Sequence, residues 1–358
     1  MRFHAPYLEW AKKRKSPRFD LAGSNIRACS IDDIEGARDA LNLSGHNDDG
    51  YGPLVEAIAQ RYRVSPEWVA TANGAAGANF QVCAALLEPG DDVLVERPAY
   101  DPLLGAPRML GANVIRFDRH FEDGYALDPD RVAQAITPRT RLIIVSSPHN
   151  PTGARADRTA LAEIGLIARS VGAHVLVDQV YLDAAGVGLE PAVLDGDVFV
   201  STSSLTKSYG LSGLRCGWSL SSPDIAERIR RARDIVDGNG SIIAERLATL
   251  AFAQLDRLTA RANALLAANG ALMREFFQAN PELEVTVHER ATVAFPRIRQ
   301  VEDTTRFAER LLAEREVAIV PGRFFEAPRH FRVGFGGPTE SLRIGLAAIA
   351  DALAARAW

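Results

Sequence analysis

The chain has 358 residues, 47% of them hydrophobic and 24% charged, which is an average composition for a soluble protein of roughly two or three domains. Its net charge of -4 gives no broad field that would attract nucleic acid, so no nucleic-acid partner is expected. No apolar stretch approaches the ~20 residues that span a bilayer, and Cys29, Cys83 and Cys216 are far apart, so we expect a cytoplasmic protein with no membrane partner.

Short β-branched segments alternate with helical patterns between about residues 73 and 220. Strands are expected at 93–96, 113–117, 141–147, 174–178, 197–203 and 216–220, with helices at 77–88, from Pro129 onward and at 158–172. These strands are apolar on both faces, which is typical of a mostly parallel sheet covered by helices on both sides.

Long charged amphipathic helices are expected from Pro223 to about residue 279, and short strands mixed with helices follow them. The first 44 residues are too few to fold alone. We therefore predict an α/β protein with a large domain, residues 45–250, whose mostly parallel central sheet is flanked by helices. A smaller α+β domain is predicted from both chain ends, residues 1–44 and 251–358.

Polar residues follow two of the predicted strands. Asn150 begins an Asn-Pro-Thr-Gly turn after strand 141–147, and Asp178 ends strand 174–178, with Tyr181 three residues later. Open parallel sheets bind their ligands at the edge where the carboxyl ends of the strands lie. A carboxylate buried there needs a cation or a strong donor opposite it. Taken alone, each residue also fits an ordinary turn or cap.

Lys207 lies in a loop rich in Ser, Thr and Gly that follows strand 197–203. Poor solvation lowers a lysine pKa and frees its amine to attack carbonyls, so Lys207 is a candidate for a Schiff base. Arg215, Ser204 and Thr206 offer a cation and two hydroxyls that suit a phosphate. The alternative for each of them is a surface loop residue.

Two further features belong to the same edge of the predicted sheet. Ala75 and Ala76 stand at the start of helix 77–88, where free N–H groups attract anions, and Tyr100 follows strand 93–96, where its ring can lie on a planar ligand. Together these parts would hold a phosphorylated heteroaromatic aldehyde, which indicates pyridoxal 5'-phosphate (PLP).

The same residues, in the same order, resemble the class I/II aminotransferases, which are fold-type I PLP enzymes: Gly74-Ala75-Ala76, Tyr100, Asn150-Pro-Thr-Gly153, Asp178-x-x-Tyr181, Ser204-Leu-Thr-Lys207 and Arg215. The resemblance implies that Lys207 forms the Schiff base and moves the proton between Cα and the cofactor. It implies that Asp178 pairs with the pyridine nitrogen, that Tyr181 and Asn150 bond the ring oxygen and that Tyr100 stacks on the ring. Ala75, Ala76, Ser204, Thr206 and Arg215 would bind the phosphate.

For the substrate, the resemblance implies that Arg332 binds the α-carboxylate, with Asn150 and Gly23 beside it. The chain departs from the family pattern at Gly23-Ser24-Asn25-Ile26, where many members have Gly-Glu-Pro. The family tyrosine that reaches the partner subunit's phosphate is also missing from its usual place, and Tyr51 is a candidate substitute. A second cation for a dicarboxylate substrate could come from Arg18, Arg27, Arg108 or Arg323, among which the sequence does not choose.

We therefore predict a homodimeric PLP-dependent aminotransferase with shared active sites, acting on α-amino acids and 2-oxo acids. The alternative is a PLP-dependent lyase, cyclase or oxidase of specialised amino-acid metabolism, because these reactions share the same motifs. A ligand-responsive regulator of the same fold is disfavoured, since no helix-turn-helix precedes residue 45. No metal site is expected, because the seven histidines show no ligand spacing.

Overall fold

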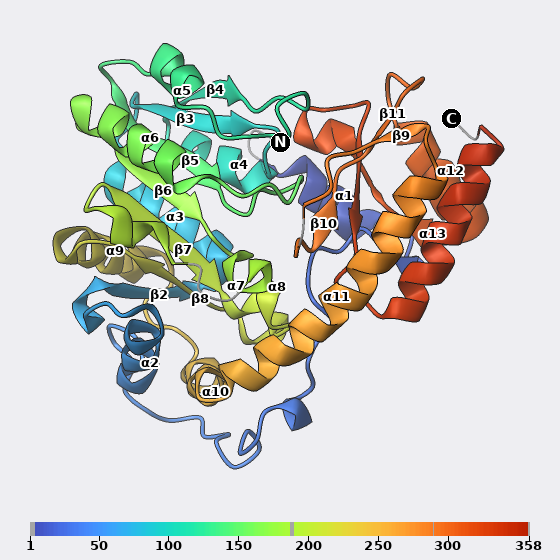
Figure 1. Ribbon diagram of the computed structural model, residues 1–358. Helices are drawn as coiled ribbons and strands as arrows, with labels where there is room; N and C mark the ends of the chain where they lie inside the picture. The colour runs from blue at the N-terminus through green and yellow to red at the C-terminus, as the bar shows by residue number, and fades with distance from the viewer. Residues whose placement is uncertain (1–3, 187–189, 289, 357–358) are drawn as a thin grey trace.

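The computed structural model describes residues 4–186, 190–288 and 290–356, so the outermost ends of the predicted small domain lie outside the described residues. A seven-stranded sheet has the order β2-β8-β7-β6-β5-β3-β4 (Figure 1). Its strands are β2 (Val69–Asn73), β3 (Asp92–Arg97), β4 (Asn113–Asp118), β5 (Thr140–Ser146), β6 (His174–Asp178), β7 (Phe199–Ser204) and β8 (Cys216–Leu220). Only β8 runs opposite to the other six strands of this sheet, so the predicted mostly parallel sheet is confirmed.

Both faces of this sheet are covered by helices, which explains why its strands lack polar alternation. Along β5, Leu142 and Ile144 face α3 (Gly74–Leu86), α4 (Asp101–Met109) and α9 (Pro223–Val236). Ile143 and Val145 face α5 (Pro129–Ala135) and α6 (Arg158–Ser170) on the other side. Full burial of each such side chain contributes about 1.5–3 kcal/mol, so a polar residue at any of these positions would destabilise the sheet.

A second lobe is built from C-terminal elements. Its helices are α11 (Leu255–Ala279), α12 (Thr305–Arg315) and α13 (Thr339–Ala354), and its strands are β9 (Leu283–Glu284), β10 (Val293–Ala294), β11 (Arg297–Ile298), β12 (Val317–Ala318), β13 (Val320–Pro321) and β14 (Phe331–Gly334). All of these strands are short, and β14 is the longest of them with four residues. Pro296 separates β10 from β11, since a proline donates no hydrogen bond to a ladder.

The first 44 residues divide between the two lobes. Strand β1 (Phe19–Asp20) pairs with β12, and Leu21 and Ile26 pack in the C-terminal lobe. Ile34 and Ala37, which the prediction assigns to the small domain, pack instead with α2 (Gly52–Tyr62) and α10 (Ile242–Phe252). The long helix α11 also begins in that cluster and ends in the C-terminal core. The two-domain division itself stays a prediction.

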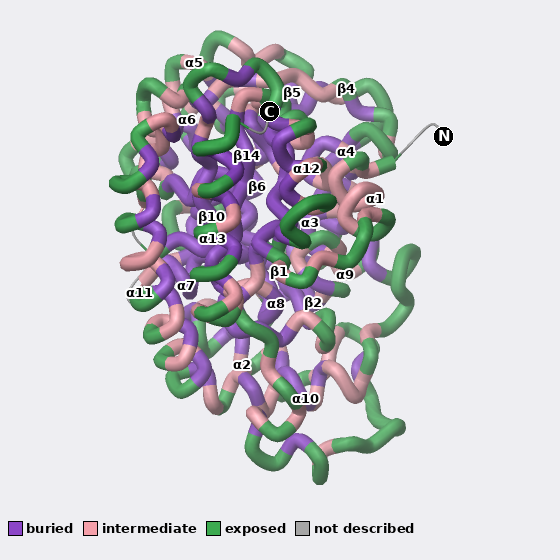
Figure 2. Tube along the Cα trace, turned by 90° about the vertical axis from the view of Figure 1, so that its right-hand side faces the viewer, coloured by how far each residue is buried: buried purple, intermediate pink, exposed green. Residues whose placement is uncertain are grey.

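Figure 2 shows buried residues concentrated in the interior, around β6, β10 and β14, and exposed residues along the periphery. Residues 41–46 are all exposed. None of the helices in the described ranges is long and apolar enough to cross a bilayer. The same part of the chain holds no group of three or more His, Cys, Asp or Glu side chains placed to bind a metal ion.

Candidate active site

The carboxyl ends of β5, β6 and β7 meet the N-terminus of α3 at a cavity of about 120 Å³. Parallel strands end at one edge of a sheet, so residues far apart in sequence come together there. Ten residues named from the sequence line this cavity: Ala75, Ala76, Tyr100, Asn150, Asp178, Tyr181, Ser204, Thr206, Lys207 and Arg215. We refer to it as the Lys207 cavity.

Lys207 lies in the short helix α8 (Leu205–Ser208), where the Ser204 hydroxyl accepts a hydrogen bond from the Thr206 N–H. Its Nζ donates to Ser24 Oγ at 3.0 Å and to Asn25 Oδ1 at 2.6 Å. Burial, followed by the charge of Arg332, lowers the pKa of Lys207 to about 7. A substantial fraction of its amine is therefore uncharged at neutral pH and able to act as a nucleophile or base.

Lys207 also stands apart from the other lysines of the chain. The sequence contains four, of which Lys12, Lys13 and Lys15 lie near the N-terminus and are exposed. Lys207, by contrast, is surrounded by protein, and this burial lowers the pKa of its amine.

Asp178 ends β6 and is buried at the base of the Lys207 cavity. Its carboxylate accepts hydrogen bonds from Asn79 Nδ2 at 2.8 Å and from the Val180 N–H at 3.1 Å. Burial raises the pKa of Asp178, and it makes no ion pair within the described ranges. The sequence predicts a cation or a strong donor opposite this carboxylate. Because the two observed donors are neutral, a bound cation would still stabilise the carboxylate.

Asn79, which the sequence analysis missed, fixes the orientation of Asp178. Its Oδ1 accepts a hydrogen bond from Thr202 Oγ1 at 2.6 Å, so its Nδ2 must face the carboxylate. The available signal was an asparagine inside the helix α3, where this residue is a poor helix former.

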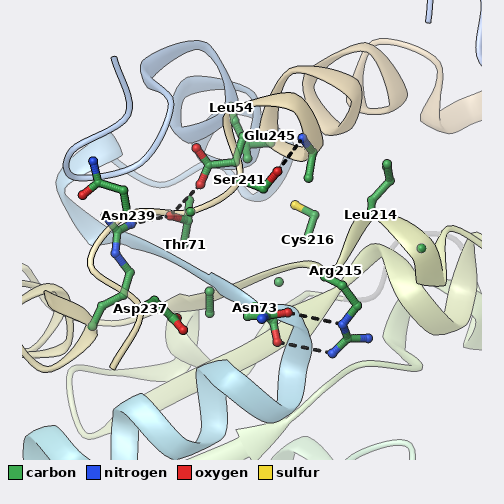
Figure 3. A pocket seen from close by; sticks show the side chains of 16 residues that line it. Leu54, Thr71, Asn73, Leu214, Arg215, Cys216, Asp237, Asn239, Ser241 and Glu245 are labelled. Carbon is green, nitrogen blue, oxygen red and sulfur yellow. Dashed lines mark hydrogen bonds between the residues drawn. The ribbon is translucent and has the colours of Figure 1, made fainter. Parts of the chain in front are cut away.

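Several donors gather at the N-terminus of α3, where Ala75 and Ala76 lie in the first turn. Gly74 has φ +69°, and a Cβ at this position would collide with Nη2 of Arg215. Arg215 bonds Asn73 through Nε and Nη2, each at 3.3 Å (Figure 3). The buried Thr206 hydroxyl has no hydrogen-bond partner in the described part of the chain. This combination of free N–H groups, a cation and a hydroxyl suits a phosphate.

Arg332 lies on β14, fully buried, and faces Asn150. Its Nη1 donates to Asn150 Oδ1 at 2.8 Å, and its Nη2 donates to Tyr7 Oη at 2.7 Å and to the Ala22 carbonyl at 2.8 Å. Among the described residues, Nε has no hydrogen-bond partner and no carboxylate pairs with this guanidinium. A buried arginine with only neutral partners is a strong site for a ligand carboxylate.

Tyr7, another residue that sequence reasoning missed, links the two lobes near Arg332. It lies in helix α1 (Pro6–Lys13), and its N–H donates to Asp101 Oδ2 at 2.6 Å. Its ring packs edge-on against Tyr100, with centroids 5.9 Å apart. The only sequence signal was Pro6 at the start of a short amphipathic helix.

The backbone of Asn150 is connected through Ser146 to a buried ion pair. Glu96 Oε2 accepts from Arg119 Nη1 at 2.8 Å, and Glu96 Oε1 accepts from the Ser146 hydroxyl at 2.6 Å. The Asn150 N–H donates to the same hydroxyl at 3.3 Å.

His149 is fully buried and bonded to the Pro98 carbonyl and Thr152, which makes it a structural histidine.

Other residues named from the sequence do not line the Lys207 cavity. Gly23 precedes Ser24 but is not part of the lining. Tyr51 is the residue before α2, and its N–H donates to Glu245 Oε2 at 3.0 Å. The candidates for a second cation are all exposed and outside the lining: Arg18, Arg27, Arg108 and Arg323.

A second, larger cavity of about 480 Å³ adjoins the first at Arg215. Figure 3 shows Asn73 and Arg215 on one side of it and Thr71, Glu245 and Ser241 on the other. We call it the Glu245 cavity. Its lining carries both buried charge and open polar groups, and of the residues that line the Lys207 cavity it shares only Arg215.

The sequence profile of the family "Aminotransferase class I and II" matches residues 25–349. Capreomycidine synthase of Streptomyces vinaceus is 31% identical, over 99% of this chain and 94% of that protein. The arginine–pyruvate transaminase AruH of Pseudomonas aeruginosa is 30% identical, over 82% of this chain and 78% of that protein.

Solved structures give the same relationship. A PLP-dependent aminotransferase from Streptococcus suis superposes with a TM-score of 0.94 and 29% identity, over 99% of each chain. The PLP-dependent cyclase OrfR superposes with a TM-score of 0.90 and 30% identity, over 99% of this chain and 98% of that one. The architecture is therefore shared with an aminotransferase and with a cyclase.

Proposed function

The chain belongs to the class I and II aminotransferase family of PLP-dependent enzymes, and from this premise we propose that it transfers the amino group of an α-amino acid to a 2-oxo acid. One arrangement carries the proposal. The weakly basic amine of Lys207 lies close to two buried groups that have no ionic partner among the described residues, the carboxyl of Asp178 and the guanidinium of Arg332. They are complementary to a pyridinium and to a substrate carboxylate.

The residues of the Lys207 cavity fit PLP. The glycine at position 74 leaves room for Arg215 beside the first turn of α3, and the Thr206 hydroxyl has no hydrogen-bond partner among the described residues. A phosphate would bind Arg215 and Thr206, together with Ala75, Ala76 and Ser204. Asp178 would hold the ring nitrogen and Tyr100 the ring face. Asn150 Oδ1 accepts a hydrogen bond from Arg332, so Asn150 Nδ2 would donate to the ring oxygen beside Tyr181.

When bound, PLP supplies a carbonyl that links to amines and a ring that withdraws electrons from the carbon being deprotonated. Lys207 would hold the cofactor covalently, take the proton from the substrate Cα and return it on the cofactor side. Arg332 would bind the α-carboxylate through its fork and so direct the Cα–H toward Lys207. Tyr7 and Tyr100 would exclude water from this region.

The proposal is tested with a panel of ¹⁵N-labelled amino acids offered together with unlabelled 2-oxo acids. Mass spectrometry should find the ¹⁵N label in a new amino acid derived from the 2-oxo acid. If the labelled nitrogen is found only as ammonia, or stays in a rearranged product, transamination is wrong.

A cyclising or eliminating PLP enzyme is the second candidate. It is favoured by the full-length match to capreomycidine synthase and OrfR, and by Ser24 and Asn25, which depart from the family pattern and contact Lys207. Its sign would be a cyclised or unsaturated product that forms without any 2-oxo acid acceptor. The same labelled panel distinguishes the two reactions.

We also propose a homodimeric, cytoplasmic enzyme of amino-acid metabolism. Leu43 and Ile235 are 83% and 88% exposed, and Ile235 lies two residues before Asp237, which lines the Glu245 cavity. A partner subunit would cover such apolar side chains. Light scattering should give twice the 38.8 kDa chain mass, whereas a fully active monomer would contradict the dimer. The free cysteines Cys29, Cys83 and Cys216 are consistent with a reducing compartment.

Arg332→Lys should weaken carboxylate binding. The lysine keeps a charge but loses the two-pronged geometry, so we expect KM to rise roughly 100-fold, with a smaller change in kcat. The variant should also lose most of the preference of the wild type for an amino acid over its methyl ester. Arg323→Lys, an exposed arginine of the same lobe, is the matched control. An unchanged ester preference in Arg332→Lys would contradict the assignment.

A further inference from the structure

The contacts of Ser24 and Asn25 concern the reacting amine itself. An uncharged lysine amine has two N–H groups and one lone pair. Lys207 Nζ is within hydrogen-bond distance of two acceptors, Ser24 Oγ at 3.0 Å and Asn25 Oδ1 at 2.6 Å. Both N–H groups are thus engaged, and the lone pair takes the remaining tetrahedral direction, away from this segment.

The roles within this hydrogen-bond chain are fixed by a third contact. Tyr181 Oη donates to Ser24 Oγ at 2.9 Å, so the Ser24 oxygen accepts from both Tyr181 and Lys207. Because both of its lone pairs are used, Ser24 has no capacity to accept a third bond, and its own proton is directed elsewhere. Ser24 is buried, so water does not compete readily for these bonds.

The backbone holds the segment in a fixed position relative to Lys207. The Ile26 N–H donates to the Lys207 carbonyl at 3.0 Å, and the Arg27 N–H donates to the Gly336 carbonyl at 2.7 Å. A Cβ at Gly336 would collide with the Asn25 carbonyl, so glycine permits the close approach. Segment 24–27 is therefore tied both to the lysine and to the loop that follows β14, the strand of Arg332.

We propose that Ser24 and Asn25 orient the lone pair of Lys207, and so determine how fast this amine attacks a carbonyl and removes a proton from the substrate Cα. The inference rests on the proposed function for its substrate class. It assigns a role to the segment in which this chain departs from the family pattern.

Variants Ser24→Ala, Asn25→Ala and the double variant test the proposal in two ways. In the apoprotein, covalent attachment of added PLP, followed by absorbance, should slow about tenfold in each single variant, with the same final stoichiometry. In the holoenzyme, exchange of the substrate α-proton in D₂O should slow by a similar factor, while KM stays within about twofold because Arg332 is unchanged. Ser24→Thr should recover most of the rate.

The exposed Ser44→Ala is the matched control and should behave like the wild type. Wild-type rates in the Ser24 and Asn25 variants would overturn the inference, and so would a complete failure to attach PLP, which would show a structural role. If wild-type holoenzyme exchanges no α-proton with any amino acid, the proposed function fails, whereas the attachment rates still test the orientation of Lys207.

Discussion

Lys207→Ala should abolish covalent attachment of PLP and lower kcat by at least about 10⁴-fold, the upper range for a positioned acid–base group, because the variant also loses the attachment point. The absorbance band of the lysine-bound cofactor should be missing from the purified variant, and borohydride should fix no cofactor to the chain. Single-turnover kinetics measure the remaining rate.

The pH dependence of PLP attachment should also reflect the environment of the Lys207 amine. Its pKa is lowered to about 7, so the rate of PLP attachment to the apoprotein should rise as the pH passes through 7 and then level off. A solvated lysine would continue to gain reactivity up to about pH 10.4. The exposed Lys15→Ala variant is the control and should attach PLP normally. A Lys207→Ala protein that retains a borohydride-reducible cofactor would contradict the assignment.

Asp178→Asn should produce the second-largest loss. The substitution keeps the size of the side chain but removes the charge that would face the ring nitrogen, and breaking such a buried pair costs about 3–5 kcal/mol. We therefore expect kcat/KM to fall roughly 10²- to 10⁴-fold, with weaker retention of PLP during dialysis.

The stability of the apoprotein should not follow the activity. Burial raises the pKa of Asp178 in the folded protein. The ionised carboxylate therefore destabilises the fold at every pH above the pKa that an aspartate has in the unfolded chain. Asp178→Asn removes this cost and one accepted hydrogen bond, so the melting temperature of the apoprotein should stay close to that of the wild type. Asp224→Asn, at an exposed position in α9, is the control. Full activity in Asp178→Asn would contradict the role proposed for this carboxyl.

The parallel strands were predictable because their sequence pattern is local. Residues 142–145 are apolar at consecutive positions, which is typical of a strand covered on both faces. Strand β2 (Val69–Asn73) was missed, since two of its five residues are alanines, which favour strands weakly. The antiparallel direction of β8 was also not predicted from the sequence. Its link from β7 spans only residues 205–215, too short for a parallel crossover of a dozen or more residues.

The residues that line the Lys207 cavity could be named from the sequence, because they follow predicted strands or begin a predicted helix at one edge of the sheet. The residues that orient them could not. Asn79 is 99 positions from Asp178, Ser24 is 183 from Lys207, and Tyr7 is 325 from Arg332. Such contacts depend on how segments far apart in the sequence pack together, and no periodic pattern in the sequence records them. The departure at Ser24 and Asn25 was visible, but its contact with the lysine was not.

The most direct test of this account is to reduce the PLP-loaded protein with borohydride and to map the modified peptide by mass spectrometry. The chain has only four lysines, and three of them lie between residues 12 and 15, so the two possible locations give clearly different peptides. We predict stoichiometric modification of Lys207 alone. Modification of the N-terminal lysines, or an unmodified Lys207 in an active enzyme, would contradict the central claim that this amine carries the chemistry.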